Sequence, residues 1–139
     1  MEKKKIVVGL SGGVDSSVAA YLLKEEGYEV IGVTMTHFRE QNLPKGVMSS
    51  SEKIVQDAAR VAEHLGIRHY VADVCPEFQE HVIDYFIKEY LSGRTPNPCV
   101  VCNRYIKWKA LLDEGAKHGA ELLATGHYAR IEQLANGRY

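Results

Sequence analysis

The sequence predicts an α/β fold with a mostly parallel, twisted sheet and helices on both faces. Short apolar runs alternate along the chain with helical segments, and glycine-rich turns separate them. The runs are nearly unbroken in apolar character, as expected for strands covered on both faces. Such alternation is typical of right-handed β-α-β units. With 139 residues, of which 45% are hydrophobic, the chain can bury one core.

The first half of the β-α-β pattern begins at residues 4–10, an apolar run that predicts the first strand. A helix follows and ends at Gly27, because glycine is the usual residue just beyond a helix C-terminus. Residues 29–35 predict the second strand. Residues 37–48 contain a proline and a glycine and show no period, so they predict a loop.

A second helix, a third strand and a third helix follow this loop. Ser49 and Glu52 have the spacing of a capping box, and Gly66 marks the end of that helix. Residues 68–74 predict the third strand, and Pro76 suits the first turn of the next helix. We expect the apolar face of that helix to belong to the core; its members are Phe78, Val82, Tyr85, Phe86 and Tyr90.

The last part of the chain starts with a proline-rich loop at residues 92–98. Helical periodicity then continues to Gly119, and residues 122–125 predict a fourth strand. The tail could begin a hairpin, because Asn136-Gly137 is a favourable turn dipeptide. The glycine- or serine-rich loops after strands one, two and four would converge, since ligands bind outside the carboxyl ends of parallel strands.

The most informative motif is the loop between the first strand and the first helix, Ser11-Gly12-Gly13-Val14-Asp15-Ser16-Ser17. Its glycines would let the backbone approach a phosphate, because they lack Cβ and tolerate positive φ. Free N–H groups in the first helical turn would then bind the anion. The motif is neither a P-loop nor a dinucleotide-binding glycine motif. The alternative is an ordinary glycine turn with a serine cap.

Charge and hydropathy exclude several classes of protein. The net charge of -1 excludes a uniformly basic nucleic-acid-binding protein, though not a local basic patch. No apolar run reaches the roughly 18 residues of a membrane span, and the first one is too short for a signal peptide. Three cysteines do not predict a disulfide framework. We therefore expect a reducing, cytoplasmic location and no membrane partner.

A second motif, Thr95-Pro96-Asn97-Pro98-Cys99-Val100-Val101-Cys102-Asn103, contains a Cys-x-x-Cys pair. Such a pair is typical of a redox site, half of a metal site or a cluster site. The sequence has no second pair to complete a zinc site, and the proline loop differs from a thioredoxin context. Because Cys102 lies near a helix N-terminus with Arg104 and Lys107, we expect the thiolate character that a nucleophile needs.

Three motifs together resemble the tRNA-specific 2-thiouridylase (MnmA/TrmU) family. The glycine loop is similar to the pyrophosphate-binding signature (PP-loop) of ATP pyrophosphatases. The others are Gly-Arg-Thr-Pro-Asn-Pro-x-x-x-Cys-Asn at residues 93–103 and Ala-Thr-Gly-His-Tyr-Ala-Arg at residues 124–130. The resemblance covers nearly the whole chain. It implies a PP-loop nucleotide-binding domain over residues 1–129, with residues 130–139 starting a further region.

The resemblance implies an enzyme that uses ATP and Mg²⁺ to adenylate O2 of the wobble uridine of tRNA. Persulfide sulfur from a donor protein then displaces AMP. Catalytic roles fall to Asp15 and Cys102. The residues implied to bind ATP are Gly9, Leu10, Ser11, Gly12, Gly13, Val14, Asp15, Ser16, Met35 and Gly126. Those implied to meet the target base or tRNA are Arg94, Asn97, Pro98, Cys99, Arg104 and Lys107.

Two departures from the family pattern affect this expectation. The family's second catalytic cysteine and its tRNA-gripping domains lie downstream, so the resemblance implies a truncated form that binds ATP without full thiolation. Many members carry aspartate where this chain has Cys99. Cys99 and Cys102, with a third cysteine that is missing from this chain, could ligate a [4Fe-4S] cluster. The alternatives are another PP-loop adenylating ligase, which would lack the Asn-Pro-x-x-x-Cys-Asn segment, and a non-catalytic nucleotide- or tRNA-binding module.

Overall fold

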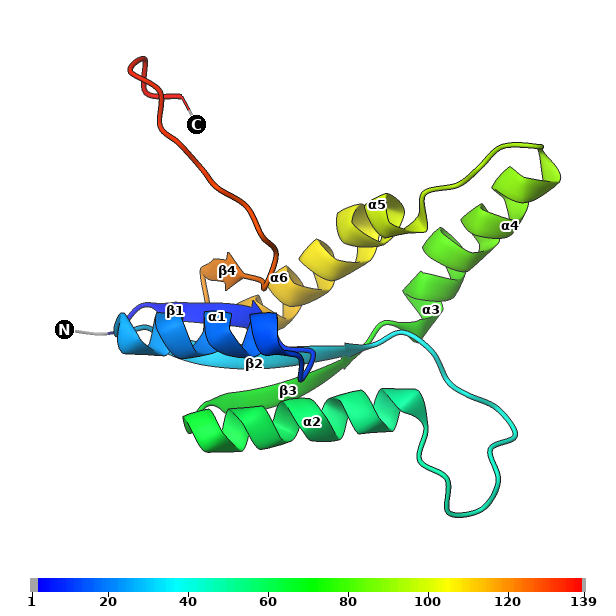
Figure 1. Ribbon diagram of the computed structural model, residues 1–139, viewed down its shortest axis with the longest axis horizontal. Helices are drawn as coiled ribbons and strands as arrows, with labels where there is room; N and C mark the ends of the chain where they lie inside the picture. Colours follow the sequence, from blue (N-terminus) through cyan, green and yellow to red (C-terminus); the bar gives the residue numbers. More distant parts are fainter. Residues whose placement is uncertain (1–2, 139) are drawn as a thin grey trace.

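The computed structural model, which describes residues 3–138, has a parallel sheet with helices on both faces (Figure 1). Within these residues the sheet has four strands in the order β3-β2-β1-β4. Their bounds are β1 (Lys5–Gly9), β2 (Glu29–Thr36), β3 (Arg68–Asp73) and β4 (Leu122–Ala124). The predicted α/β class is confirmed, and the predicted strand bounds are correct to within about one residue.

The helices occupy the predicted segments, but two of them contain a π-helical insertion. The α-helices are α1 (Val14–Glu25), α2 (Ser50–Leu65), α3 (Cys75–Phe78), α4 (Asp84–Leu91), α5 (Pro98–Cys102) and α6 (Trp108–Lys117). The π-helical segments η1 (Gln79–Ile83) and η2 (Asn103–Lys107) join α3 to α4 and α5 to α6. Their i→i+5 hydrogen bonds shift the helix by one residue, which a short hydrophobic pattern does not reveal.

Two layers of helices cover the sheet because side chains alternate between its faces. Along β1, Ile6 and Val8 pack into the core beneath α1 and α2, together with Ala20 and Ala58. Val7 belongs to the opposite cluster, which contains Leu111 of α6. The sheet is therefore buried on both sides, as the unbroken apolar runs predicted.

The order of the strands places a topological switch beside β1. This strand pairs with β2 on one side and with β4 on the other, all in parallel. Because β1 and β4 are adjacent and parallel, the loops that follow them start side by side at the carboxyl edge of the sheet and then run apart. In open parallel sheets this is where ligands bind.

Helix α2 begins and ends at the residues that the sequence indicates. The Ser49 hydroxyl oxygen accepts a hydrogen bond from the Glu52 N–H at 3.1 Å, and the Ser49 N–H donates to the Glu52 carboxylate at 2.8 Å. Gly66 ends the helix with a left-handed φ of 61°. The predicted capping box and glycine terminator are thus both confirmed.

The expectation that the whole aromatic face of the third helical stretch is buried is wrong for its distal part. Helix α4 extends away from the sheet (Figure 1). Its Phe86 and Tyr90 are 39% and 55% exposed, and their rings pack edge to face on each other. Val82, at the proximal end, is buried with Cys102. The helical stretch is therefore packed against the rest of the chain at its proximal end and exposed at its distal end.

The tail contains the predicted turn without the predicted hairpin strands. The Gly137 N–H donates to the Leu134 carbonyl at 2.9 Å, and the Leu134 N–H donates to the Arg138 carbonyl at 2.7 Å. No strand occurs in the described part of this tail, residues 130–138. Residue 139 lies outside the described residues. Across the described part of the chain, no helix has both the length and the apolar character needed to cross a membrane.

Candidate functional site

A cavity of about 370 Å³ lies at the carboxyl ends of β1, β2 and β4. This volume is within the range of small-molecule sites. The predicted convergence of the three loops is confirmed, because each contributes to the walls. The lining residues are Gly9, Leu10, Ser11, Asp15, Ser16, Thr34, Met35, His37, Ile54, Lys107, Trp108, Leu111, Thr125, Gly126 and His127.

The two glycines of the loop after β1 have different roles. Gly12 has a φ of +77°, and a Cβ there would lie 2.7 Å from the Asp57 Cβ and 3.0 Å from the Ala58 nitrogen. Its missing side chain therefore makes room for α2. Gly13 has a φ of -79° in extended backbone, so the expectation of positive φ holds only for Gly12. Neither glycine lines the cavity, and nor does Val14, which is exposed.

Serine hydroxyls hold the loop in shape. The Ser11 N–H donates to the Ser16 hydroxyl at 3.2 Å, and the Gly13 N–H donates to the Ser11 hydroxyl at 3.3 Å. The Ser17 hydroxyl donates to the Gly13 carbonyl at 2.6 Å. Gly13, the N-cap of α1, provides no side-chain cap. Backbone N–H groups of the first turn therefore remain available to an anion, and the helix dipole favours negative charge there.

A buried hydrogen-bond chain seats the start of the loop on β2. The Leu10 N–H donates to the Val33 carbonyl at 2.8 Å, and the Thr34 hydroxyl donates to the Leu10 carbonyl at 2.6 Å. Because that hydroxyl hydrogen is used, His69 Nε2 must donate to Thr34, at 2.7 Å. Burial lowers the pKa of His69. Thr34 and His69 were missed by the sequence reasoning, since nothing local distinguishes them from other strand residues.

The segment after β4 closes against the first turn of α1. A Cβ on Gly126 would lie 2.7 Å from the Ser16 nitrogen and 3.0 Å from the Asp15 carbonyl carbon, so only glycine fits this contact. The Tyr128 hydroxyl donates to Asp15 Oδ1 at 2.8 Å. This carboxylate raises the pKa of Tyr128. Asp15, Ser16 and Gly126 are thus brought together as predicted, with Tyr128 as an addition.

His37, from the loop after β2, and Lys107, from η2, both line the cavity. His37 Nε2 is buried and has no hydrogen-bond partner among residues 3–138. Its ring meets Phe78 edge to face at a centroid distance of 5.1 Å. Burial lowers the pKa of His37, and the positive charge of Lys107 lowers it further. His37 was missed because it follows β2 in a stretch predicted only as a loop.

Aromatic rings border the same cavity. Trp108 and His127 stack with their centroids 5.9 Å apart and their planes 28° apart. Trp108 is 39% exposed, so part of its side chain is accessible. Flat rings of this kind are the surfaces on which nucleobases stack.

Cys102 lies outside the cavity lining. It is 7% exposed and packs with Val74, Val82 and Ile106. Burial raises the pKa of its thiol, and Lys107 offsets only part of that effect. The expectation of thiolate character is therefore wrong for this conformation, because the loss of solvation outweighs the nearby cation. Cys99, by contrast, is exposed.

The other residues expected at the target base make contacts within the chain. Asn97 Oδ1 accepts the Val100 N–H at 3.3 Å and caps α5, and Pro98 occupies its first turn. Arg94 donates two hydrogen bonds to the Glu89 carboxylate, at 2.8 and 2.7 Å. Arg104 lies over the Tyr105 ring at 5.3 Å and borders a separate hollow between η1 and α5. Lys107 is the one member of this group that lines the cavity.

The cysteine pair does not form a cluster site in this conformation. The exposed Cys99 and the buried Cys102 lie in different environments. Within the described residues no group of three or more His, Cys, Asp or Glu side chains is placed to hold a metal ion. The described residues therefore do not by themselves supply a ligand set for a [4Fe-4S] cluster.

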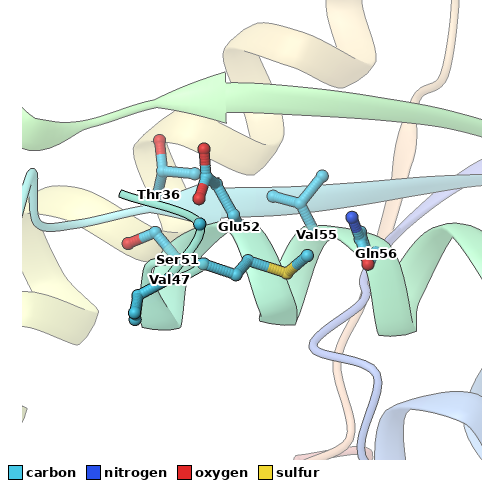
Figure 2. Close-up of a pocket in the computed structure, with 8 residues that line it drawn as sticks. Thr36, Val47, Ser51, Glu52, Val55 and Gln56 are labelled. Carbon is cyan, nitrogen blue, oxygen red and sulfur yellow. The ribbon is translucent and has the colours of Figure 1, made fainter. Parts of the chain in front are cut away.

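A second hollow, of about 490 Å³, lies beside the loop that follows β2 (Figure 2). Thr36, Val47, Ser51 and Val55 line it together with Glu52. The Glu52 carboxylate already accepts the Ser49 N–H in the capping box. No lysine or arginine is among the described residues that line this hollow, so it offers no cationic side chain to a phosphate.

The sheet topology defines an α/β domain, in which the N-terminus of α1, without a side-chain cap, lies at the carboxyl ends of the strands. A family model described as "tRNA methyl transferase HUP domain" matches residues 4–139. The chain belongs to this family.

Curated relatives extend the match. The chain is 55% identical to proteins named "tRNA-specific 2-thiouridylase MnmA" from Lachnoclostridium phytofermentans and Clostridium kluyveri, over 98% of its length in each case. It spans 39% and 38% of these two relatives. The family that the three motifs indicated is thereby confirmed.

Two solved structures share the fold. A predicted subunit of tRNA methyltransferase from Methanocaldococcus jannaschii has a TM-score of 0.58 and 27% identity, covering 97% of this chain and 60% of its own. The NMN synthetase from Francisella tularensis has a TM-score of 0.52 and 22% identity, covering 85% of this chain and 43% of its own. The latter shows likeness of fold alone.

Proposed function

We propose that this chain is the ATP-binding, adenylating part of a tRNA 2-thiouridylase. One observation carries the proposal: most of the residues that the family resemblance assigns to ATP line a single cavity at the switch point of the sheet. They are Gly9, Leu10, Ser11, Asp15, Ser16, Met35 and Gly126. The names of the relatives support tRNA as the substrate and, with it, the cytoplasm as the location.

The residues of the cavity suit a nucleoside triphosphate. Free N–H groups at the start of α1 would bind its phosphates, with the loop held in shape by Ser11 and Ser16. The Asp15 carboxylate would hold Mg²⁺, which supplies positive charge to the phosphates when bound. Trp108 would offer a stacking surface to a base. Gly12 and Gly13 would act indirectly, through the shape of the loop.

The proposed reaction has three displacements. The uridine O2 attacks the α-phosphorus of ATP, so an O–P bond forms as the bond to pyrophosphate breaks. The terminal sulfur of a persulfide, delivered by a donor protein, then attacks C2, and the C–O bond to AMP breaks. A second thiol, the role that the resemblance gives to a downstream cysteine, attacks the inner sulfur of the persulfide, so that the S–S bond breaks, a disulfide forms and 2-thiouridine is released. The Cys-x-x-Cys segment supports sulfur chemistry over methyl transfer, the reaction named by the family model. Cys102 would have to leave its apolar surroundings before it could take part.

The length of the chain, compared with that of its relatives, limits how much of this reaction we assign to it. The chain spans about two-fifths of the length of the curated relatives it matches. We propose that residues 1–129 form the nucleotide-binding domain and that residues 130–139 lead into a further region. The described tail runs away from the sheet, which supports this boundary (Figure 1).

A second candidate function is nucleotide binding without sulfur transfer. The burial of Cys102 and its absence from the cavity lining favour this alternative for the chain by itself. In that case ATP would bind, but no pyrophosphate would be released when unmodified tRNA is added.

The test is calorimetric titration with MgATP, followed by a pyrophosphate-release assay with unmodified tRNA. We expect the wild-type chain to bind MgATP and Asp15→Asn to bind it roughly tenfold or more weakly, equivalent to about 1.4 kcal/mol. Asp113→Asn is the matched control, because this exposed carboxylate pairs with Lys109 outside the cavity. Absence of MgATP binding by the wild-type chain would refute the nucleotide site. Binding without pyrophosphate release would favour the second candidate.

A further inference from the structure

The distribution of charge in the cavity singles out one side chain. Among the described lining residues, Lys107 alone is a lysine or arginine, while Asp15 contributes a carboxylate. The glycine loop lacks the lysine that follows the glycines in a P-loop. An ATP site of this kind still needs a cation near the phosphates, because a triphosphate carries several negative charges.

Lys107 is also unpaired, unlike Lys109 and Lys117 further along the same helical stretch. Lys109 pairs with Asp113 at 2.9 Å, and Lys117 pairs with Glu114 at 2.7 Å. Within residues 3–138, Lys107 takes part in none of the ion pairs or side-chain hydrogen bonds. A free ammonium group at a cavity is available to an anionic ligand.

Lys107 is the last residue of the π-helical segment η2. The Trp108 N–H donates to the Asn103 carbonyl, five residues earlier, which rotates the following side chains relative to an α-helix. Ile106 is buried in the cluster of Cys102, whereas Lys107 and Trp108 line the cavity. Insertions of this kind frequently lie at functional sites.

The effects of Lys107 on its surroundings agree with this placement. Its positive charge lowers the pKa of His37 on the cavity wall and acts on Cys102 in the adjoining core. The Lys107 ammonium group is therefore within electrostatic reach of both the cavity wall and Cys102.

We propose that Lys107 binds the phosphates of the nucleotide in this cavity, rather than the phosphates of tRNA. The inference rests on the proposed function, in which that nucleotide is ATP. The ammonium group would offset the charge of the bound phosphates and stabilise the negative charge that develops on the pyrophosphate leaving group. Lys107 then acts in adenylation, the first displacement of the reaction.

The experiment compares Lys107→Gln with Lys109→Gln, a matched change two residues away. Calorimetry measures the affinity of each variant for two ligands. The first is the Mg²⁺ complex of α,β-methylene-ATP, an analogue that cannot release pyrophosphate, and the second is adenosine. We expect Lys107→Gln to lose roughly tenfold in affinity for the triphosphate and less than about twofold for adenosine. Lys107→Arg should recover part of the loss, and Lys109→Gln should match the wild-type chain.

The outcomes separate this inference from the proposed function. Failure of the wild-type chain to bind the triphosphate would overturn both. Wild-type binding with an unchanged Lys107→Gln variant would overturn the role of Lys107 and leave the nucleotide site standing. An equal loss for adenosine and for the triphosphate would also overturn it, because Lys107 would then only shape the cavity. A Lys107→Gln variant that loses affinity for tRNA but keeps its affinity for the triphosphate would likewise overturn the role of Lys107.

Discussion

Gly12 serves the fold and the candidate site at once. Its positive φ makes the turn that aims α1 at the cavity, and its missing Cβ lets α2 pack against the loop. The motif predicted a glycine for approach to a phosphate. In the structure the close approach at this position is to Asp57 and Ala58. A residue that looks like a ligand contact in the sequence is thus a contact between elements.

The first prediction concerns that contact. Gly12→Ala should destabilise the chain by more than the roughly 1–2 kcal/mol of left-handed strain. The extra cost comes from a Cβ placed 2.7 Å from the Asp57 Cβ. Gly27→Ala is the control, because Gly27 also has positive φ, at +94°, but has nothing within 4 Å of its Cβ position. Urea unfolding of both variants measures the difference. Equal losses would show that α2 yields without cost.

At the scale of elements, the connection from β3 to α3 depends on Asp73. The Cys75 N–H donates to its carboxylate at 3.0 Å, and Arg39, from the loop after β2, pairs with it. These contacts, with the backbone hydrogen bond foremost, lower the pKa of Asp73 from 3.8 to about 2. A single carboxylate thus ties together a strand, a helix and a loop beside the candidate site.

The second prediction concerns the pH dependence of this connection. Because the folded-state pKa is below the ordinary value, the ionised carboxylate stabilises the fold above about pH 4. That contribution is lost as the pH falls from about 4 to about 2. Asp73→Asn should be less stable than the wild-type chain near pH 6, by under about 1 kcal/mol because the carboxylate is largely exposed. The difference should vanish near pH 2. Urea midpoints across this range measure it, and a difference that does not change with pH would contradict the assignment.

At the scale of the whole molecule, core and cavity share a boundary. Leu111 of α6 is 1% exposed, packs with Val7 and Ile31, and lines the cavity at the carboxyl ends of the strands. A Cβ on Gly9 would lie 3.3 Å from Leu111 Cδ1, so helix and strand are in close contact there. The cavity is therefore formed by the same packing that buries the sheet.

The third prediction tests this shared boundary. Leu111→Ala should cost about 2–5 kcal/mol in the free energy of unfolding, because it removes buried methyl groups and leaves a void. Leu112→Ala, one residue further on and 53% exposed, should cost less than about 1 kcal/mol. Urea unfolding of the two variants compares them directly. Similar losses would place the core elsewhere.

The sequence predicted the strands, the helices, the capping box at Ser49 and the convergence of the three loops. These features depend on hydrophobic period, glycine and capping residues, which act over a few neighbouring positions. Parallel strand order then follows from short right-handed connections, and it brings the carboxyl ends together. Local patterns and connection rules were therefore sufficient to place the PP-loop at the carboxyl edge of the sheet.

Only the tertiary structure decided where individual side chains lie. It buried Cys102, exposed the distal end of α4, and brought His37 and Lys107 to the lining of one cavity. These outcomes depend on contacts between elements distant in the sequence, such as the packing of Val82 in η1 against Cys102 in α5. The physical reason is that backbone periodicity is a local property. Burial, pKa and access to a ligand are set by whichever parts of the chain pack around a residue.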